Sequence, residues 1–544
     1  MNRSTLACLV GLACLVTLLN AFKPLAVDDT VNYWYARHIA QHPLDPYGFQ
    51  VHEGLDANAV LTPLGIPYYW AAAYRLFGER PFLWKLWLLP FPLIFTFSLY
   101  ALCRRFARGL EMPLVVLTVV SPTILPCLNL MLDLPALALN LLSLVLFIRG
   151  CDRGGWGHAV AAGLIGALAI QAKYTGFLAP AAMLLYAVCF RKIRLGIVAF
   201  ALPLLLFVGV ECLIAHVYGE SHFVRAFRDR EAPPAAKLLL VQPLIGILGG
   251  TASAVGVLGL AALGARRRVV LTAAAVVLLG FAAAAFAPER FAVLLGGGQP
   301  GRPKLSLNTL VFGAFGLTLF GVLAAAAWRL CRLRRPGAWR LRHWRRRRVE
   351  AFLVLWLGLE IAGYFALSPY PAVRRVMEIG VVGVLLLGRL ASRTCRSRPR
   401  VRLVWGAVGV SAVLGLAAFG ADFFIYRAEK VAAERAVRRI RERDPSAVIW
   451  APDLDGAFAF YARRAGMRRL MPSDASPRPG DWMVVLRRIG DFRPPNPWAD
   501  QWKTEATYDV KLPMPLRSRY QYGGTALDHF EGPFLTVALC RRGD

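Results

Sequence analysis

Two adjacent carboxylates, Asp28 and Asp29, follow the first long apolar run of the sequence, and Tyr33, Tyr35 and His38 stand just beyond them. A carboxylate at a water interface can act as the general base that deprotonates a hydroxyl. We therefore expect a catalytic acid pair here, with the two tyrosines and the histidine lining the substrate pocket. The alternative is a solvated helix N-terminus, where aspartate is favoured by capping and by the helix dipole.

A third carboxylate, Asp133, lies between two apolar runs. Burying a carboxylate at the centre of a membrane span costs about 2.5–3.5 kcal/mol, so such a residue usually has a partner or a function. We expect Asp133 to be a second acidic residue of the site. Capping of the next helix, with Pro135 in its first turn, is the alternative.

Four basic residues break the apolar pattern near the same side of the membrane. Lys173 interrupts a long apolar stretch, Arg374 and Arg375 form a late basic pair, and Lys85 stands just inside the second apolar run. Lysine and arginine at such positions can bind a lipid phosphate. For Lys173, snorkelling without any function is the alternative.

Carboxylates near cations at a membrane surface suit one reaction in particular. The cations would stabilise a leaving phosphate while a carboxylate activates the nucleophile. The pattern therefore indicates transfer of a group from a lipid phosphate to a hydroxyl. Residue types and spacing do not identify the group.

Composition requires a membrane around these residues. The 544-residue chain is 57% hydrophobic and only 18% charged, yet its net charge is +31. Soluble domains are about 45–50% apolar and about 25% charged, so an ordinary soluble enzyme is excluded. The basic residues form short clusters between apolar runs, which argues against a nucleic-acid surface. The ten cysteines show no spacing typical of a disulfide scaffold or a zinc site.

Thirteen apolar runs are long enough to be candidate membrane spans. They lie near residues 5–22, 82–103, 112–130, 133–149, 158–172, 174–190, 195–216, 238–263, 269–287, 306–328, 350–367, 376–390 and 401–421.

Basic clusters occur in every second connection, as the positive-inside rule requires of cytoplasmic loops. We therefore expect a cytoplasmic N-terminus and an extracytoplasmic C-terminus in a bacterial inner membrane. A signal peptide at Met1–Ala26 is the alternative for the first run. The clusters are Arg104 to Arg108, Arg149 and Arg153, Arg191 to Arg194, Arg266 to Arg268, Arg329 to Arg348, and Arg393 to Arg402.

The predicted architecture is a polytopic helical membrane domain over residues 1–421 and a small extracytoplasmic α/β domain over 422–544. The second segment contributes only +5 to the net charge. Its pattern predicts helices at 426–443 and 456–466 and strands at 447–450 and 482–486. The first outer connection, 23–80, is rich in aromatic residues and proline, and we expect amphipathic helices on the membrane surface there.

Several segments resemble the GT-C membrane glycosyltransferases. DDTVNYWYARHIAQHPLDPYGF and TPLGIPYYWAAAYRLFGERPFLWKL are similar to the first outer loop and second span of protein O-mannosyltransferases, lipid A aminoarabinose transferases and lipopolysaccharide-core sugar transferases. LMLDLPALAL, AIQAKYTGFLAPAAMLLY and SPYPAVRRVMEIGV resemble the later acidic, lysine and arginine motifs. The resemblance covers the first six spans, more loosely the late spans, and the C-terminal domain through YARRAGMRRL, RPGDWMVV and DHFEGPF.

The resemblance implies a polyprenyl-phosphate-linked sugar as donor, inversion at the anomeric carbon, and an active site at the outer face beneath a soluble domain. It implies Asp28 as the catalytic acid residue and Asp133 as the second acidic site. Lys173 with Arg374 or Arg375 would hold the donor phosphate. Many relatives carry Glu where this chain has Asp29, which leaves the roles within the pair open.

We expect no cofactor and metal-independent transfer. Adjacent acids such as Asp28 and Asp29 differ from the spaced acids of metal-using relatives, and Asp453 with Asp455 is typical of a surface turn. A divalent ion held by three first-loop residues is the alternative. These residues are His42, His52 and Glu53.

Two other functions remain open. A transporter or lipid flippase would also have many spans, but the charges cluster at span ends and no inverted repeat is evident. A non-catalytic relative that binds the lipid-linked sugar is the second. The sugar and the oligomeric state are not identified by the sequence, and a glycan, a lipid or a protein could each be the acceptor.

Overall fold

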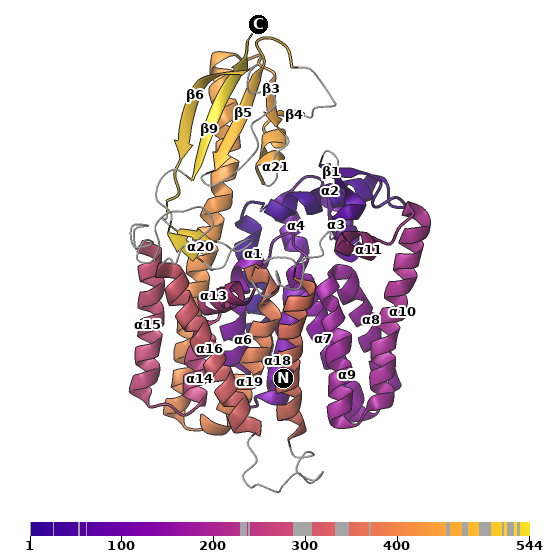
Figure 1. The fold of residues 1–544 in the computed structure, drawn as a ribbon, viewed down its shortest axis with the longest axis vertical. Helices are drawn as coiled ribbons and strands as arrows, with labels where there is room; N and C mark the ends of the chain where they lie inside the picture. Colours follow the sequence, from indigo (N-terminus) through magenta and orange to yellow (C-terminus); the bar gives the residue numbers. More distant parts are fainter. Residues whose placement is uncertain are drawn as a thin grey trace.

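A bundle of long helices carries a small sheet domain at one end in this computed structural model (Figure 1). We call the end that bears the sheet domain the capped end and the opposite end the arginine-rich end. The structure describes residues 2–25, 27–52, 55–60, 62–228, 237, 240–286, 307–331, 347–368, 371–452, 457–470, 477–488, 502–513, 516–518, 527–529 and 534–543.

Every predicted apolar run contains at least one helix of the bundle. The helices are α1 (Arg3–Phe22), α4 (Pro81–Trp87), α5 (Pro90–Phe106), α6 (Glu111–Val119), α7 (Asp133–Arg153), α8 (Trp156–Ala172), α9 (Leu178–Phe190), α10 (Ile193–Tyr218), α13 (Val241–Thr251), α14 (Ser253–Ala262), α15 (Arg267–Phe286), α16 (Leu307–Cys331), α18 (Arg348–Leu367), α19 (Met377–Thr394) and α20 (Arg398–Arg443).

Within the described residues, seven helices are long and apolar enough to cross a membrane, or eight if the pair α13 and α14, bent by 75°, forms one span. The number of thirteen spans therefore stays a prediction. The predicted span 112–130 is helical only as far as Val119, followed by the short turn η2 (Leu125–Cys127). Pro122 and Pro126 explain the early end, because proline cannot donate the backbone hydrogen bond that continues a helix.

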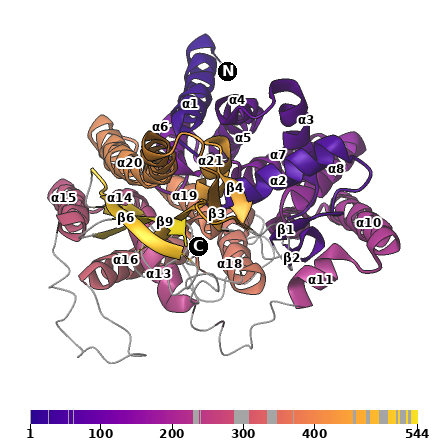
Figure 2. The same ribbon diagram turned by 90° about the horizontal axis from the view of Figure 1, so that it is seen from above.

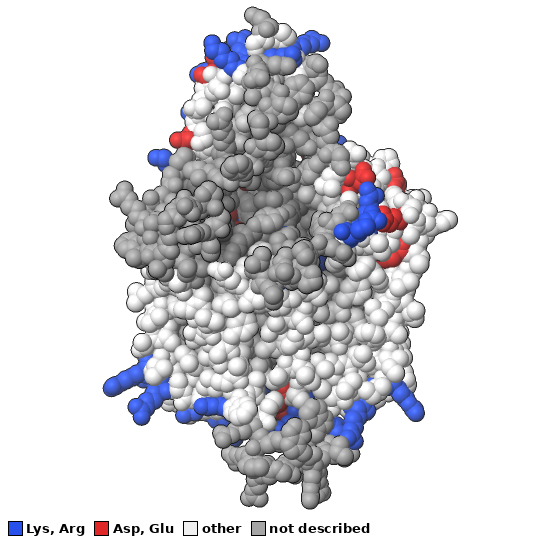
Figure 3. Space-filling view, viewed as in Figure 1, with Lys and Arg blue, Asp and Glu red and all other residues white. Residues whose placement is uncertain are grey.

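The surface of the bundle matches a bilayer. On the face that it displays, Figure 3 shows a broad band of the bundle without Lys, Arg, Asp or Glu, bordered by Lys and Arg side chains at the arginine-rich end. An uncharged band with a basic border at one side is the pattern of a polytopic membrane protein. The arginine-rich segment 332–346 lies outside the described residues.

The first loop covers the capped end with short elements, as predicted for residues 23–80. Figures 1 and 2 show α2 and α3 lying across the ends of the bundle helices. Gly78 ends α3 with a positive φ of 60°, a conformation that favours glycine. The elements of the cap are α2 (Val27–Gln41), β1 (Gln50–His52), β2 (Leu55–Asp56), η1 (Ala57–Ala59), α3 (Gly65–Phe77) and, from a later loop, α11 (His222–Arg228).

The longest helix, α20, leaves the bundle and enters the sheet domain. Its 46 residues span about 69 Å. The predicted domain boundary at residues 421 and 422 therefore falls inside one continuous helix, and the helix predicted at 426–443 is its second half. Both apolar and charged residues are compatible with a helix. The change in composition therefore reflects a change from lipid to water around α20, and the helix itself continues.

The C-terminal domain contains a mixed five-stranded sheet in the order β4-β3-β5-β9-β6. β3 is parallel to β4 and β5, whereas β9 is antiparallel to β5 and β6. The predicted strands at 447–450 and 482–486 and the helix at 456–466 correspond to β3, β5 and α21. The elements are β3 (Ile449–Pro452), α21 (Ala457–Arg464), β4 (Arg468–Leu470), β5 (Trp482–Arg488), β6 (Trp502–Val510), β7 (Leu516–Ser518), β8 (Leu527–His529) and β9 (Leu535–Arg542).

Direct polar contacts join this domain to the bundle and its cap. The Tyr508 hydroxyl donates to the carbonyl oxygen of Ala432 in α20 over 2.9 Å. In α21, the Arg463 guanidinium meets the Glu79 carboxylate at 2.7 Å. Burial tends to raise the pKa of Glu79, but the hydrogen bonds from Arg463 and Tyr33 outweigh it and hold that pKa below its usual value.

We predict that acid loosens α21 from the cap through Glu79. Its folded-state pKa is depressed, so its contribution is present above the unfolded glutamate pKa of about 4.3 and is lost as pH falls through the folded value. The protection factors of the backbone amides of residues 457–464, which compare exchange with its intrinsic rate at each pH, should fall as the pH drops below about 4.3. Glu79→Gln should remove most of this pH dependence, whereas Asp152→Asn, which alters an exposed ion pair of Arg105, should leave it unchanged. An unaltered pH profile in Glu79→Gln would contradict the assignment.

Candidate functional site

A buried lysine organises the capped end. The Lys23 ammonium, just after α1, forms an ion pair with Asp422 of α20 at 2.9 Å and donates to the Pro126 carbonyl oxygen at 2.6 Å. Both charged side chains are almost fully enclosed. In the same region, Asn20 donates to the carbonyl oxygen of Leu125 over 2.8 Å. These contacts fix the segment 120–132, which leads to Asp133.

Asp29 and Lys85, both predicted site residues, lie together in the interior. Their charged atoms are 3.9 Å apart, and neither side chain is exposed to solvent. The Lys85 ammonium also donates to the carbonyl oxygens of Lys23 (2.7 Å) and Pro24 (3.0 Å). Two of the three donors of this ammonium are thus hydrogen-bonded to backbone carbonyl oxygens, and the Asp29 carboxylate lies nearby as the opposite charge. Lys85 thus holds the start of the first loop against α4.

Asp28 lies in the first turn of α2, but its side chain is outside the described part of the structure. Its position precedes Asn32 by four residues, so the two positions share a face of the helix. Asn32 donates to the carbonyl oxygen of Leu130 over 2.5 Å. The face of α2 that contains position 28 is therefore packed toward the segment that leads to Asp133.

The structure assembles the other predicted charges into one cluster. Asp133 at the start of α7 forms an ion pair with Lys173, which lies between α8 and the turn η3 (Tyr174–Phe177). Arg374 and Arg375, in the turn η5 (Val373–Arg375), both act electrostatically on Asp133. Arg374 also donates to the Met131 sulfur at 3.2 Å. Residues more than 200 positions apart thus meet at one end of the bundle.

The predicted pocket residues of α2 make contacts within the cap. Tyr33 is buried against Trp84 and donates to Glu79 over 2.7 Å. The Tyr35 hydroxyl donates to the Ala57 carbonyl oxygen over 2.5 Å, and the His38 ring pairs with the Asp45 carbonyl oxygen at 2.7 Å. These contacts fold the loop onto α2. Among the described contacts, none joins Tyr33, Tyr35 or His38 to the Asp133 cluster.

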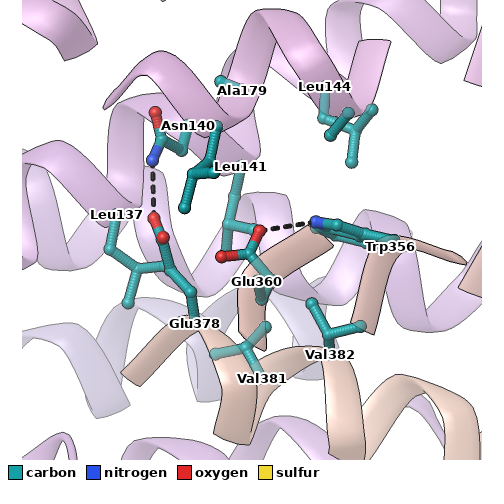
Figure 4. Close-up of a pocket in the computed structure, with 12 residues that line it drawn as sticks. Leu137, Asn140, Leu141, Leu144, Ala179, Trp356, Glu360, Glu378, Val381 and Val382 are labelled. Atoms are coloured by element: carbon teal, nitrogen blue, oxygen red, sulfur yellow. Dashed lines mark hydrogen bonds between the residues drawn. The ribbon is translucent and has the colours of Figure 1, made fainter. Parts of the chain in front are cut away.

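A narrow pocket below this cluster contains two carboxyl groups that were not singled out from the sequence. Figure 4 shows Glu378 hydrogen-bonded to Asn140 and Glu360 to Trp356, between apolar side chains of α7, α18 and α19. Both carboxyl groups line the same pocket, one from α18 and the other from α19. The pocket has room for about one water molecule.

A third unpredicted carboxylate, Glu211 of α10, holds the start of α11. It accepts hydrogen bonds from the Tyr174 hydroxyl (3.2 Å), the Ser221 hydroxyl (2.6 Å) and the Phe223 backbone N–H (2.9 Å). Tyr174 directly follows Lys173, so this network also positions the lysine. The signal that could have revealed Glu211, Glu360 and Glu378 is an acid within an apolar run, which generally has a function or a partner.

Three basic side chains gather around Asp133. Three cations, Lys173, Arg374 and Arg375, act on one carboxylate. The cluster is therefore suited to an anion with phosphate character, since lysine and arginine bind phosphate by charge-assisted hydrogen bonds.

Within the described residues, no group of three His, Cys, Asp or Glu side chains could hold a metal ion. Two members of the alternative metal site in the first loop, the His52 side chain and Glu53, lie outside the described part of the chain, as do Asp453 and Asp455. Metal-independent transfer stays a prediction.

No protein-family model and no curated protein match the sequence. The structure is similar to that of ArnT from Cupriavidus metallidurans bound to undecaprenyl phosphate, with 16% sequence identity, a TM-score of 0.45, and coverage of 99% of this chain and 98% of that one. It is also similar to the archaeal oligosaccharyltransferase AglB from Archaeoglobus fulgidus in complex with an inhibitory peptide and a dolichol-phosphate, with 10% identity, a TM-score of 0.45, and coverage of 89% and 70%. Both are GT-C glycosyltransferases, the family whose motifs this sequence resembles.

We predict that breaking the Lys23–Asp422 pair destabilises the protein strongly. Asp422→Asn leaves an uncompensated buried ammonium, and such a loss typically costs about 3–5 kcal/mol in the free energy of unfolding. Lys23→Met combined with Asp422→Leu should unfold at a midpoint closer to wild type than either single variant, because no lone charge remains. Denaturant unfolding of the full chain in detergent would measure this. Arg105→Gln, at an exposed pair, serves as the control and should change stability by no more than about 1 kcal/mol.

Proposed function

We propose that this chain is an inverting glycosyltransferase that moves a sugar from a polyprenyl-phosphate donor to an acceptor hydroxyl. The observation that carries the proposal is the positive cluster of Lys173, Arg374 and Arg375 around Asp133. It lies at the end of an apolar bundle, where a lipid chain in the membrane would present its phosphate. The sequence motifs that contain these residues resemble those of GT-C enzymes, which supports the same reading.

The proposed reaction is a single displacement at the anomeric carbon. The acceptor oxygen forms a bond to that carbon while the bond to the phosphate oxygen breaks, and configuration inverts because the attack comes from the opposite side. The hydroxyl proton passes to a carboxylate. Polyprenyl phosphate leaves with the electron pair, and Lys173, Arg374 and Arg375 stabilise its negative charge.

We propose Asp28 as the general base in place of Asp29. The Asp29 carboxylate is fully buried beside Lys85, which gives it a structural environment. Position 28 shares a helical face with Asn32, and that face packs toward the Asp133 segment. A base on this face can meet an acceptor beside the proposed phosphate site, whereas Lys85, first expected to bind phosphate, serves to hold the loop.

We further propose that the capped end faces outward from the bacterial inner membrane. The arginine-rich end would then be cytoplasmic together with the N-terminus, in accordance with the positive-inside rule. The C-terminal domain would lie in the periplasm above the site. The acceptor would be a glycan, a lipid or a protein of the cell envelope, and the reaction would need no metal or cofactor.

We predict that Asp28→Asn lowers transfer by a factor of about 10² to 10⁴, because an amide cannot take the hydroxyl proton. Purified full-length protein would be given a panel of polyprenyl-phosphate sugars, and release of polyprenyl phosphate would be followed by mass spectrometry. Asp152→Asn, at an exposed ion pair near the arginine-rich end, should retain wild-type release. Full activity in Asp28→Asn would remove Asp28 from this role.

The same assay separates the competing functions. If wild type releases no polyprenyl phosphate from any donor but still binds it, a transporter or a non-catalytic binding protein explains the cation cluster better than an enzyme does. Loss of release with a chelator and its return with Mn²⁺ would overturn metal-independent transfer.

We predict that Arg375→Gln weakens recognition of the phosphate. Removing one preorganised cation from a developing negative charge typically lowers kcat about 10²- to 10³-fold. Inhibition by the product polyprenyl phosphate should weaken in parallel, a readout that does not depend on the acceptor. Arg108→Gln, at an exposed position near the arginine-rich end, provides a control of equal charge. Unchanged product inhibition in Arg375→Gln would contradict a phosphate site here.

A further inference from the structure

A second site lies on the side of the capped end where the sheet domain meets the bundle. A cleft of about 810 Å³ opens between the adjoining ends of α1 and α4 and the helices α20 and α21. Seen from above, these four helices meet on one side of the molecule (Figure 2). The volume is within the range of about 300–1,000 Å³ typical of sites for small ligands. The proposed glycosyl transfer makes no use of this cleft.

The floor of the cleft is aromatic and exposed. Phe22, the last residue of α1, and Phe82, in the first turn of α4, have ring centroids 5.2 Å apart. They are 68% and 39% exposed. Both lie where an apolar helix reaches the membrane surface, the level at which exposed apolar rings contact lipid.

The upper wall is basic. Arg80, directly before α4, and Arg464, at the end of α21, line the cleft together with Lys430 and, among the described lining residues, one acid, Glu434. The acid is already paired with Lys430 at 3.8 Å. Among the described residues, neither Arg80 nor Arg464 has an ion-pair partner. The cleft therefore presents two uncompensated guanidinium groups above an aromatic floor.

Each of these two arginines directly follows a residue of the ion pair between the first loop and the C-terminal domain. Glu79 and Arg463 form a direct ion pair that joins the first loop to the C-terminal domain. The next residues along each segment, Arg80 and Arg464, carry the same charge and face one cleft. Both side chains are exposed to solvent, so an anion can reach them.

We propose that this cleft binds the headgroup of an anionic membrane lipid. Arg80 and Arg464 would hold the phosphate, since guanidinium groups match phosphate oxygens in geometry and charge. Phe22 and Phe82 would contact the first part of the acyl chains. The lipid would bridge the first loop and the C-terminal domain beside the Glu79–Arg463 pair. This site is separate from the donor site, and its test needs no transfer activity.

Native mass spectrometry of the full-length protein in neutral detergent would test the proposal. The protein would be titrated with dioleoylphosphatidylglycerol and, in parallel, with dioleoylphosphatidylcholine. We expect preference for the anionic lipid, and an affinity about 30-fold weaker in the double variant Arg80→Gln/Arg464→Gln, since each basic residue near an anionic lipid contributes about a factor of five. Arg80→Lys/Arg464→Lys should retain most of the binding. Arg104→Gln/Arg108→Gln, near the arginine-rich end, provides the control of equal charge.

Several outcomes would overturn the proposal. Equal binding of both lipids would remove the role of charge, and equal loss in the control variant would show a general effect of net charge. Complete displacement of the lipid by millimolar inorganic phosphate would identify a free anion as the ligand. The thermal unfolding midpoint of each variant would be measured first. If the glutamine variant is unfolded, Phe22→Ala/Phe82→Ala replaces it and should weaken lipid binding while leaving any binding of inorganic phosphate unchanged.

Discussion

An enclosed ammonium must be met by opposite charge and by hydrogen-bond acceptors, because moving a charge out of water is costly. Lys23 satisfies this requirement with Asp422 and the Pro126 carbonyl oxygen, and it thereby draws α1, α20 and the segment 120–132 together. Its own carbonyl oxygen accepts from Lys85, which lies beside Asp29. At Gly415 of α20, a Cβ atom would lie 1.9 Å from the Val120 carbonyl oxygen, so the two backbones are in contact. The position of the candidate site depends on this one buried charge.

The cluster of Asp133, Lys173, Arg374 and Arg375 could be predicted because each residue stands at the end of an apolar run. Alternation of basic loops assigns these ends to one side of the membrane. The partners of Lys23, Glu211 and Glu360 could not be predicted in the same way. Hydropathy predicts which helix carries a charged residue and at what height. The residue that pairs with this charge depends on which helices pack side by side. Tyr35 and His38 illustrate the same limit, because their direction is set by the loop that folds over α2.

At the level of the fold, apolar runs located every helical segment of the bundle. Their lengths were less informative, as α6 shows: the run continues to residue 130, but prolines end the helix at Val119. The domain boundary shows the opposite case, since the composition changes at 422 while the helix continues to Arg443. Composition reports the solvent around a segment, and backbone chemistry decides where a helix ends.

Because α20 is continuous, the number of its residues between the bundle and the C-terminal domain determines how the domain is rotated about the helix axis. Asp422 must face Lys23 near the middle of the helix, while Ala432 must face Tyr508 farther along it. One inserted or deleted residue between these points would rotate the whole domain by about 100° and shift it by about 1.5 Å along the axis. The number of residues in this stretch is therefore more tightly constrained than the identity of its exposed side chains. Length variation in such a protein is to be expected in its loops. The length of α20 sets the distance between the membrane and the C-terminal domain.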